Sequence, residues 1–194
     1  MKTENKLLKL QARESLAGKW GLAVGTFALY FVICMIVGSI KKIGFVISLI
    51  ISGPLSVGVA IFSLSISRGG QAKLNQIFEG FNNFGRSLAA YLLVLLFTLL
   101  WSLLLIVPGI IASLAYSQTY YILADDQKIS AREAIKKSKK MMMGNKWKFF
   151  VLVLSFLGWL ILSLLTLGIG LIWLLPYMNI SMAKFYEDIK GQIN

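Results

Sequence analysis

Hydrophobic and polar positions form long separate blocks along this chain instead of alternating over a few residues. No charged residue occurs in four stretches, at 20–40, 43–67, 87–124 and 149–183. Because roughly 20 residues of helix cross the hydrocarbon core of a bilayer, the first two stretches are each about one span long. The last two stretches are each long enough for about two spans.

Proline and glycine divide both of the longer stretches near their middle. The sequence VPG at 107–109 interrupts the third stretch, and LGIG at 167–170 interrupts the fourth. Since Pro and Gly favour turns over continued helix, each stretch should form two helices. The pattern therefore predicts an all-α membrane protein with six transmembrane helices, at 20–40, 45–67, 87–106, 109–124, 148–167 and 171–187. Pro54 lies within the second helix, where we expect it either to kink the helix or to begin it after an interfacial segment.

The composition supports this prediction. Of the 194 residues, 57% are hydrophobic, and the mean hydropathy is +0.75. A soluble chain of this size would lack the polar residues needed to cover its surface. We treat residues 1–194 as a single integral membrane domain with three units, at 1–67, 68–125 and 126–194. Charges are spread over the N-terminal residues 1–19, so we expect no cleavable signal peptide, which needs a compact apolar run.

The charges predict how the helices are oriented. If six helices alternate in direction, eighteen of the twenty cations and all eight acids fall on the side that holds both termini. Only Lys41 and Lys42 fall on the other side, where they would anchor the first two helices or contact a lipid phosphate or an acidic partner. Because lysine and arginine concentrate in cytoplasmic loops, the sequence predicts a multi-pass protein of the cytoplasmic membrane with both termini cytoplasmic.

The densest group of cations lies at 128–148, with eight cations and one acid, Glu133. Within it, residues 131–142 have the spacing of a basic amphipathic helix that lies in the inner membrane interface. Small and apolar residues form one face of this helix: Ala131, Ala134, Ile135, Ser138, Met141 and Met142. Cations form the other face: Arg132, Lys136, Lys137, Lys139 and Lys140.

The ends of this helix also carry sequence signals. Ser130 and Glu133 have the S-x-x-E spacing of a capping box, and the GN sequence at 144–145 suits a left-handed turn. The next residues are of the kinds that settle in the headgroup layer: Lys146, Trp147 and Lys148. The cations of both segments are the candidate site for anionic lipid or a partner protein, since each one near an anionic leaflet contributes about 1 kcal/mol. Nucleic acid is disfavoured as a partner, because the stretch lacks aromatic residues interleaved for base stacking.

A loose internal repeat is also visible. One unit consists of a polar helix, a glycine followed by a cation, a span, and a proline near the start of the next span. The three glycine–cation markers stand at 18–19, 85–86 and 144–146, and the three prolines at 54, 108 and 176. The repeat predicts three parallel helix–hairpin units, in which the odd-numbered helices run outward and the even-numbered helices run inward.

Polar side chains gather on the even-numbered helices. Small and hydroxyl residues at helical spacing let membrane helices approach closely and hydrogen-bond to each other, so helix packing is the simplest role. The alternative is a polar path for a small substrate. The candidate residues for either role are Ser56, Ser63, Ser113, Ser117, Tyr120 and Asn179.

The residue types present exclude several kinds of site. The chain has no histidine and one cysteine, Cys34, which excludes intrachain disulfides, Cys/His metal sites and His-dependent catalytic pairs. No ionisable residue lies deep in a predicted helix, which argues against proton-coupled transport. The acid pairs at 125–126 and 187–188 could bind Mg²⁺ and orient a phosphate, but compensation of their charge by neighbouring lysines is simpler. We therefore predict no cofactor and no metal, and a catalytic function is disfavoured.

Four separated motifs resemble those of one known family. They are, in order, VPGIIASLAYSQTYYILADD, ISAREAIKKSKKMMMGNKWKFFVLVLSFLGWLIL, LGIGLIWLLPY and FYEDI. They are similar to the bacterial integral-membrane family catalogued as domain of unknown function 975, most specifically over 85–190 and more loosely before it. The resemblance implies a protein of the cytoplasmic membrane of a Gram-positive bacterium. It supplies no activity, substrate or site residue.

Three functional hypotheses follow. The first is a non-enzymatic membrane protein that binds anionic lipid or a partner protein at its cytoplasmic face, accessory to transport or envelope maintenance. The second is a small oligomeric pore or carrier lined by the polar even-numbered helices. The third is a membrane enzyme that acts on a lipid phosphate through the inner acid pairs.

Overall fold

The fold is all-helical, as the sequence predicts. The computed structural model describes residues 3–40 and 43–191. Within these ranges it contains ten α-helices and one 3-10 helix, and no strand. The predictions made for Lys41 and Lys42 lie outside the described residues.

Five helical stretches are long and apolar enough to cross a membrane. They are α2 (Trp20–Gly38); α3 (Gly44–Ser67); η1 (Leu74–Asn83) with α4 (Phe84–Leu104); α5 (Ile106–Tyr116) with α6 (Thr119–Asp125); and α8 (Lys146–Leu154) with α9 (Leu157–Leu165). The expected sixth span forms α10 (Leu171–Lys190), but every 18-residue stretch of it includes Lys184, Glu187 and Asp188. The prediction of six transmembrane helices is therefore not confirmed.

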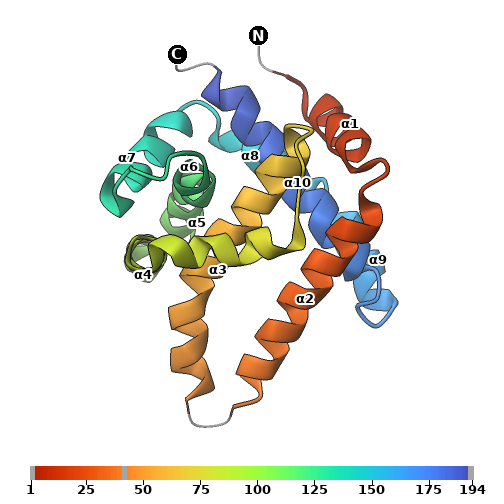
Figure 1. The fold of residues 1–194 in the computed structure, drawn as a ribbon. Helices are drawn as coiled ribbons and strands as arrows, with labels where there is room; N and C mark the ends of the chain where they lie inside the picture. The colour runs from red at the N-terminus through yellow and green to blue at the C-terminus, as the bar shows by residue number, and fades with distance from the viewer. Residues whose placement is uncertain (1–2, 41–42, 192–194) are drawn as a thin grey trace.

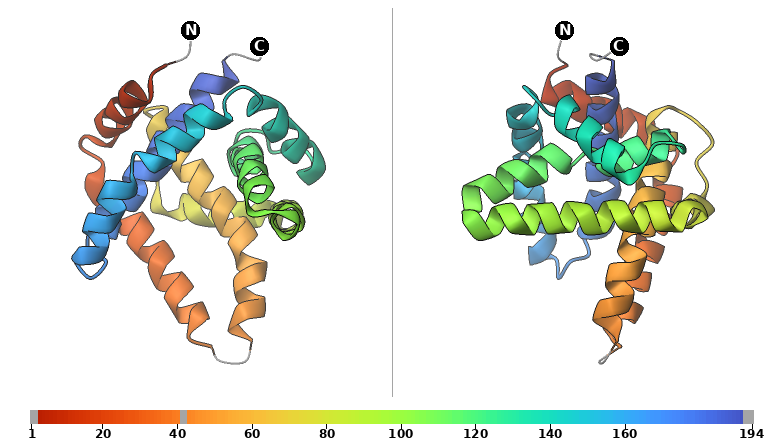
Figure 2. Two further views of the ribbon diagram at one scale, coloured as in Figure 1. Left: turned by 180° about the vertical axis from the view of Figure 1, so that it is seen from behind. Right: turned by 90° about the vertical axis from the view of Figure 1, so that its left-hand side faces the viewer.

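The helices form three hairpins that point in different directions (Figures 1 and 2). The α2–α3 hairpin extends downward in Figure 1, and the α9–α10 hairpin lies beside its upper part. The α4–α5 hairpin runs across α3 instead of alongside it, as the right-hand view of Figure 2 shows. The three parallel units expected from the loose repeat are therefore not confirmed.

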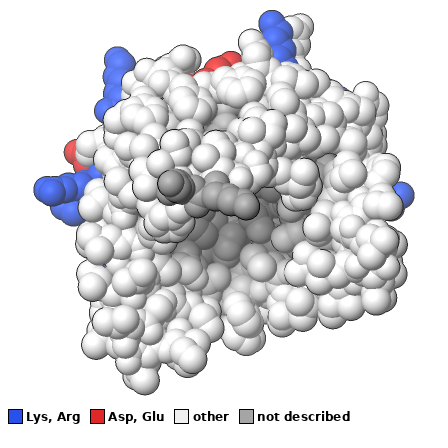
Figure 3. Space-filling view, turned by 90° about the horizontal axis from the view of Figure 1, so that it is seen from below, with Lys and Arg blue, Asp and Glu red and all other residues white. Residues whose placement is uncertain are grey.

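The charged and apolar surfaces are separated in space. Both ends of the chain lie at one end of the molecule, together with α1 (Asn5–Leu16) and α7 (Ala131–Met141) (Figure 1). Seen from the opposite end, the surface of the described residues is almost free of charge, with lysine, arginine and acidic side chains only near its rim (Figure 3). The turns of the hairpins expose large apolar side chains, including Phe45, Ile106 and Leu167, the last of which is 95% exposed. Apolar exposure of this extent is expected of a surface that contacts lipid.

Both predicted interruptions of the long apolar stretches are turns. At the first, Leu105 is extended between α4 and α5, so Pro108 falls in the first turn of α5, where its missing N–H is not needed. At the second, Leu167 and Gly168 have positive φ angles of 55° and 86°. Glycine adopts such angles without strain, which explains why the LGIG sequence reverses the chain.

Pro54 lies within α3, where the backbone of this helix closely approaches that of η1. Because α3 begins well before Pro54 and continues through it, the alternative in which this proline begins the helix is wrong. A Cβ on Gly58 would lie 1.9 Å from the carbonyl oxygen of Ile77, and one on Gly80 would lie 1.9 Å from that of Pro54. Only glycine fits at these two positions, so α3 and η1 touch backbone to backbone.

Two of the predicted helices are each divided into a pair of shorter ones. The break between α5 and α6 falls at Ser117 and Gln118, and that between α8 and α9 at Ser155 and Phe156. In each break the serine hydroxyl donates a hydrogen bond to the carbonyl three residues earlier. Such local bonds compete with the regular helical ladder.

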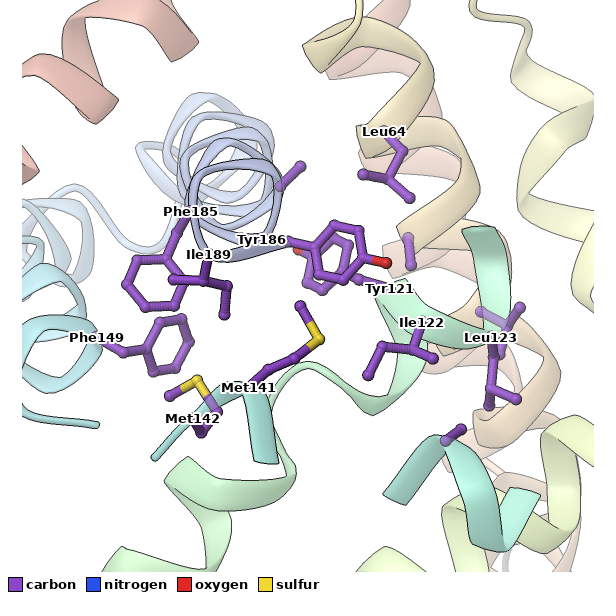
Figure 4. Packing of buried hydrophobic residues seen from close by; sticks show 14 of the residues in the cluster. Leu64, Tyr121, Ile122, Leu123, Met141, Met142, Phe149, Phe185, Tyr186 and Ile189 are labelled. Carbon is purple, nitrogen blue, oxygen red and sulfur yellow. The ribbon is translucent and has the colours of Figure 1, made fainter. Parts of the chain in front are cut away.

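The main hydrophobic core lies between α3, α6, α7, α8 and α10 (Figure 4). Tyr121 and Tyr186 stack with ring centroids 5.8 Å apart, and Phe149 packs on Phe185 at 4.9 Å. Met141, at the end of α7, lies between these two aromatic pairs (Figure 4). The core therefore fixes α7 to the body of the protein.

Candidate functional site

The basic helix α7 begins at the capping box that the sequence predicts. Ser130 Oγ accepts a hydrogen bond from the Glu133 N–H at 3.3 Å, and Glu133 Oε2 accepts one from the Ser130 N–H at 3.1 Å. The hydrogen bonds from Ser130 also lower the pKa of Glu133. Gly144 takes the expected left-handed conformation after the helix, with φ of 74°. Asn145 does not; it precedes α8 and donates to the Met141 carbonyl at 2.9 Å.

One face of α7 is covered by the protein and not by lipid. The buried residues are those assigned to the apolar face: Ala131, Ala134, Ile135, Ser138, Met141 and Met142. Ser138 Oγ donates to the Ala115 carbonyl at 2.8 Å and accepts from the Gln118 N–H at 3.2 Å. These bonds dock α7 on α5 and the α5–α6 break. An apolar face used in this way is not available to enter a bilayer.

The other face of α7 carries five exposed cations, which we call the basic surface: Arg132, Lys136, Lys137, Lys139 and Lys140. None of the five forms a salt bridge with an acid in the described part of the chain. The nearest acid in the sequence, Glu133, is held by Ser130. Glu133 keeps its negative charge and interacts electrostatically with Lys136, but one acid beside five cations leaves most of the positive charge of this surface uncompensated.

The first three residues of α8, Lys146, Trp147 and Lys148, do not all extend the basic surface. Trp147 is 74% exposed and stacks on Phe150 at 5.5 Å. Lys146 is half-buried and lines a cavity of about 290 Å³ together with Lys139. Lys148 points into the protein, where its Nζ lies 2.6 Å from Asp188 Oδ2. Lys148 is therefore a structural cation and not a free one.

The acids at 125 and 187–188 form ion pairs with lysine or arginine and do not point together at a shared metal site. Asp125 accepts from Arg68 at 2.6 Å, from Lys190 at 2.5 Å and from the Tyr186 hydroxyl at 2.9 Å. Arg68 also reaches Glu187 at 2.7 Å. We name this set the acid network: Arg68, Asp125, Tyr186, Glu187 and Lys190.

The second member of each acid pair has partners of its own. Asp126 accepts from the backbone N–H groups of Lys128 and Ile129 at 2.9 and 3.2 Å. Asp188 accepts from Lys148 and from the side chain of Thr3. Among residues 3–40 and 43–191, no cluster of three or more His, Cys, Asp or Glu side chains has the arrangement of a metal site.

Four of the six polar candidates line one partly open cavity. The cavity has a volume of about 330 Å³ and lies between α2, α3, α6 and α10. Its walls include Ser56, Ser117, Tyr120 and Asn179. A volume of this size is within the range of about 300–1,000 Å³ that is typical of small-ligand sites.

The polar groups of this cavity are only partly used by the protein itself. Ser117 Oγ donates to the Leu114 carbonyl at 2.9 Å, and Asn179 Nδ2 donates to the Leu175 carbonyl at 3.0 Å. The hydroxyls of Ser56 and Tyr120 donate no hydrogen bond to any described residue. The cavity therefore offers two hydroxyls to a neutral, hydrogen-bonding occupant or to water.

The other two polar candidates lie elsewhere. Ser63 is fully buried in α3, and its Oγ has no hydrogen-bond partner within the described ranges. Ser113 is exposed on α5, where its hydroxyl donates to the Ile110 carbonyl at 2.8 Å. The six polar candidates of the even-numbered helices are thus divided between a cavity, a packed interior and an outer surface.

Comparison with known proteins identifies the family. A family model described as a protein of unknown function (DUF975) matches residues 1–112 and 102–192. The chain belongs to this family. The match confirms the resemblance seen in the motifs and covers the N-terminal third as well. No curated protein and no solved structure matches the chain.

Sequence reasoning missed two arginines that organise the charged end of this DUF975 protein. Arg68 joins α6 to α10 through the acid network. Arg86 donates to the backbone carbonyls of Leu123, Asp126 and Ile129, at 3.0, 2.9 and 3.3 Å. It thereby satisfies carbonyls at the C-terminal end of α6 that would otherwise lack a partner. The only sequence signal was the position of each arginine at the edge of a charge-free stretch.

Proposed function

We propose that this protein is a non-enzymatic integral membrane protein whose basic surface binds anionic lipid at the cytoplasmic leaflet. One observation carries the proposal: five cations lie exposed on one side of α7 without an acidic partner among the described residues. Because each such cation contributes about 1 kcal/mol near an anionic leaflet, the five together would hold the protein firmly to that surface. A role accessory to transport or envelope maintenance fits such a protein.

The burial of the other face of α7 defines what kind of contact is proposed. With Ala134, Ile135 and Met141 packed inside the protein, α7 has no apolar face to insert between lipids. The contact would be electrostatic, screened by salt over a Debye length of about 8 Å at physiological ionic strength. The orientation with both termini cytoplasmic is part of the same proposal, since the termini lie at the end of the molecule that carries α7 (Figure 1).

The test is a fourfold variant, with Lys136, Lys137, Lys139 and Lys140 replaced by glutamine. Glutamine has nearly the same helix propensity as lysine, so we expect the fold to persist while the preference for anionic over zwitterionic lipid falls. Native mass spectrometry and lipid-dependent thermal stability measure that preference in purified protein.

A pair of double variants provides the matched control. Lys136→Gln with Lys137→Gln removes two charges from the basic surface, whereas Lys6→Gln with Lys73→Gln removes two exposed charges elsewhere. The first pair should lower the lipid preference more than the second. Equal effects would mean that only net charge matters, and an unchanged preference in the fourfold variant would favour docking of a partner protein.

The second candidate function is a small pore or carrier, and the cavity lined by Ser56, Ser117, Tyr120 and Asn179 favours it. Four polar candidates from three different elements meet there, which packing alone does not require. With Cys34 replaced by alanine, Ser117→Cys should react with a small water-soluble thiol reagent if the cavity holds water. Ser63→Cys, in the packed interior, is the control that should stay unreactive. If neither cysteine reacts with the reagent, the serines of the cavity serve helix packing and not a polar path.

The third hypothesis, an enzyme that uses the acid pairs, has no comparable observation in its favour. Asp125 and Asp188 are each already engaged by a lysine at 2.5 and 2.6 Å. We therefore do not propose a catalytic role for them.

A further inference from the structure

One cleft of the described structure is lined by elements other than α7, which carries the basic surface. It has a volume of about 550 Å³ and runs between the α1–α2 junction and the α9–α10 hairpin. Three tryptophans line it, Trp20, Trp159 and Trp173, with Tyr177 beside them. Trp159 and Trp173 are 58% and 52% exposed, so the cleft opens to the surroundings of the protein.

The two ends of this cleft differ in chemistry. Arg13 and Trp20 lie at the α1–α2 junction, and Thr166 and Gly170 lie at the turn of the α9–α10 hairpin. Near that turn, the hydroxyls of Ser163 and Thr166 donate to backbone carbonyls at 2.7 and 2.8 Å. Both hydroxyl protons are therefore already used within the protein, and this end of the cleft offers a ligand mainly apolar contacts.

The opposite end of the cleft carries an uncompensated charge. Arg13 is exposed and forms no salt bridge within residues 3–40 and 43–191. No acidic residue lines the cleft. A guanidinium binds phosphate through two parallel hydrogen bonds, and tryptophan is the residue that most often lines the boundary between headgroups and acyl chains.

We propose that this cleft is a site for one anionic phospholipid. Arg13 would bind the lipid phosphate, and the tryptophan-lined apolar part would hold an acyl chain. The positive charge disfavours a ligand with a cationic head, and the exposed apolar walls disfavour a free soluble anion. This site is independent of the basic surface on α7, which would attract a leaflet without selecting a single molecule.

The experiment uses the purified full-length protein in detergent, with phosphatidylglycerol and phosphatidylcholine of the same acyl chains as probes. Native mass spectrometry counts the lipid molecules that each variant retains. Wild type should retain one phosphatidylglycerol in preference to phosphatidylcholine. Arg13→Gln should reduce that preference about tenfold, as expected for loss of a charge-assisted contact, and Arg13→Lys should keep most of it.

Two further variants separate the cleft from the rest of the surface. Lys6→Gln removes an exposed charge from the same helix but outside the cleft, and should leave the retained lipid unchanged. Trp159→Ala should weaken retention of both lipids, whereas Trp101→Ala, on the α4–α5 hairpin, should not. If Arg13→Gln fails to fold, lipid retention by the two tryptophan variants tests the proposal. A loss in Trp159→Ala but not in Trp101→Ala supports it, and equal retention contradicts it.

The outcomes distinguish this site from the basic surface. In the same native mass spectrometry experiment, the fourfold lysine variant of α7 should lose the additional anionic lipids held by the basic surface and still retain the single phosphatidylglycerol. Equal retention of the two lipids by wild type, or equal losses in Arg13→Gln and Lys6→Gln, would overturn the proposal. A lipid lost from the fourfold variant alone would place the bound molecule on α7 instead.

Discussion

Two charged regions lie at the same end of the molecule and use their charges in opposite ways. In the acid network, Asp125 has three partners within 2.5 to 2.9 Å. On the basic surface, five cations have no acidic partner among the described residues. The first arrangement fixes helices to each other, and the second leaves charge available to something outside the protein. Positive residues in a membrane protein therefore cannot be assigned to topology or binding by number alone.

The difference arises from which helices face each charge. Arg68, at the end of α3, and Lys190, at the end of α10, both point at the end of α6, where Asp125 lies. Lysines and acids there compensate each other within a half-buried site. On α7, the capping box holds the one acid, Glu133, at the start of the helix, where it interacts with Lys136, so most of the positive charge that follows faces solvent.

The largest effect should follow from breaking the acid network. Asp125→Asn removes the charge that Arg68 and Lys190 share, and should destabilise the protein by about 2–3 kcal/mol, since Lys190 is left without a counter-charge and Arg68 keeps only Glu187. Thermal unfolding in detergent measures the loss. Lys137→Gln, on the basic surface, is the control and should change stability by less than about 0.5 kcal/mol. Similar losses in both variants would mean that the two regions do not differ as described.

A smaller effect should appear in acid, at Asp188. Burial favours a higher pKa for this carboxyl, but the hydrogen bonds from Lys148 and Thr3 outweigh burial and lower it. A folded-state pKa below the unfolded value of about 3.9 means that the ionised carboxylate stabilises the protein above about pH 4. That contribution is lost as the pH falls through the folded-state pKa.

Asp188→Asn tests this pH dependence directly. The variant should lose about 1 kcal/mol at neutral pH and show a flatter decline of stability below about pH 4 than wild type. Thermal unfolding at a series of pH values measures both. An unchanged acid decline in the variant would show that another carboxyl controls it.

The positions of the helices could be predicted from the sequence because apolar length is a local property. The charge-free stretches, the VPG and LGIG turns and the capping box at Ser130 all depend on neighbouring residues. The directions of the hairpins could not be predicted from the sequence, because they depend on contacts between distant residues, such as that of Gly58 with the Ile77 backbone. The breaks at Ser117 and Ser155 were also missed, because serine is common within membrane helices.

The candidate sites were predictable to a similar extent. Spacing correctly assigned the residues of α7 to two faces, but it could not show that Ser138 docks on Ala115, 23 residues away. Lys148 was grouped with the free cations because its partner Asp188 lies 40 residues later. The cavity around Ser56 and Asn179 depends on four helices, α2, α3, α6 and α10, that meet only in the folded chain.

The charge-free turns of two hairpins bear on how the protein is assembled in the membrane. Residues 87–124 and 149–183 hold no ionisable group of the Asp, Glu, Lys or Arg type. A hairpin of this kind can enter a bilayer turn-first as one unit, because no ammonium or carboxylate has to be dehydrated on the way. The α2–α3 hairpin differs, since the segment that joins its helices contains Lys41 and Lys42. During biosynthesis, the first hairpin is thus the one expected to depend on the translocation machinery, and the other two can follow by partitioning into lipid.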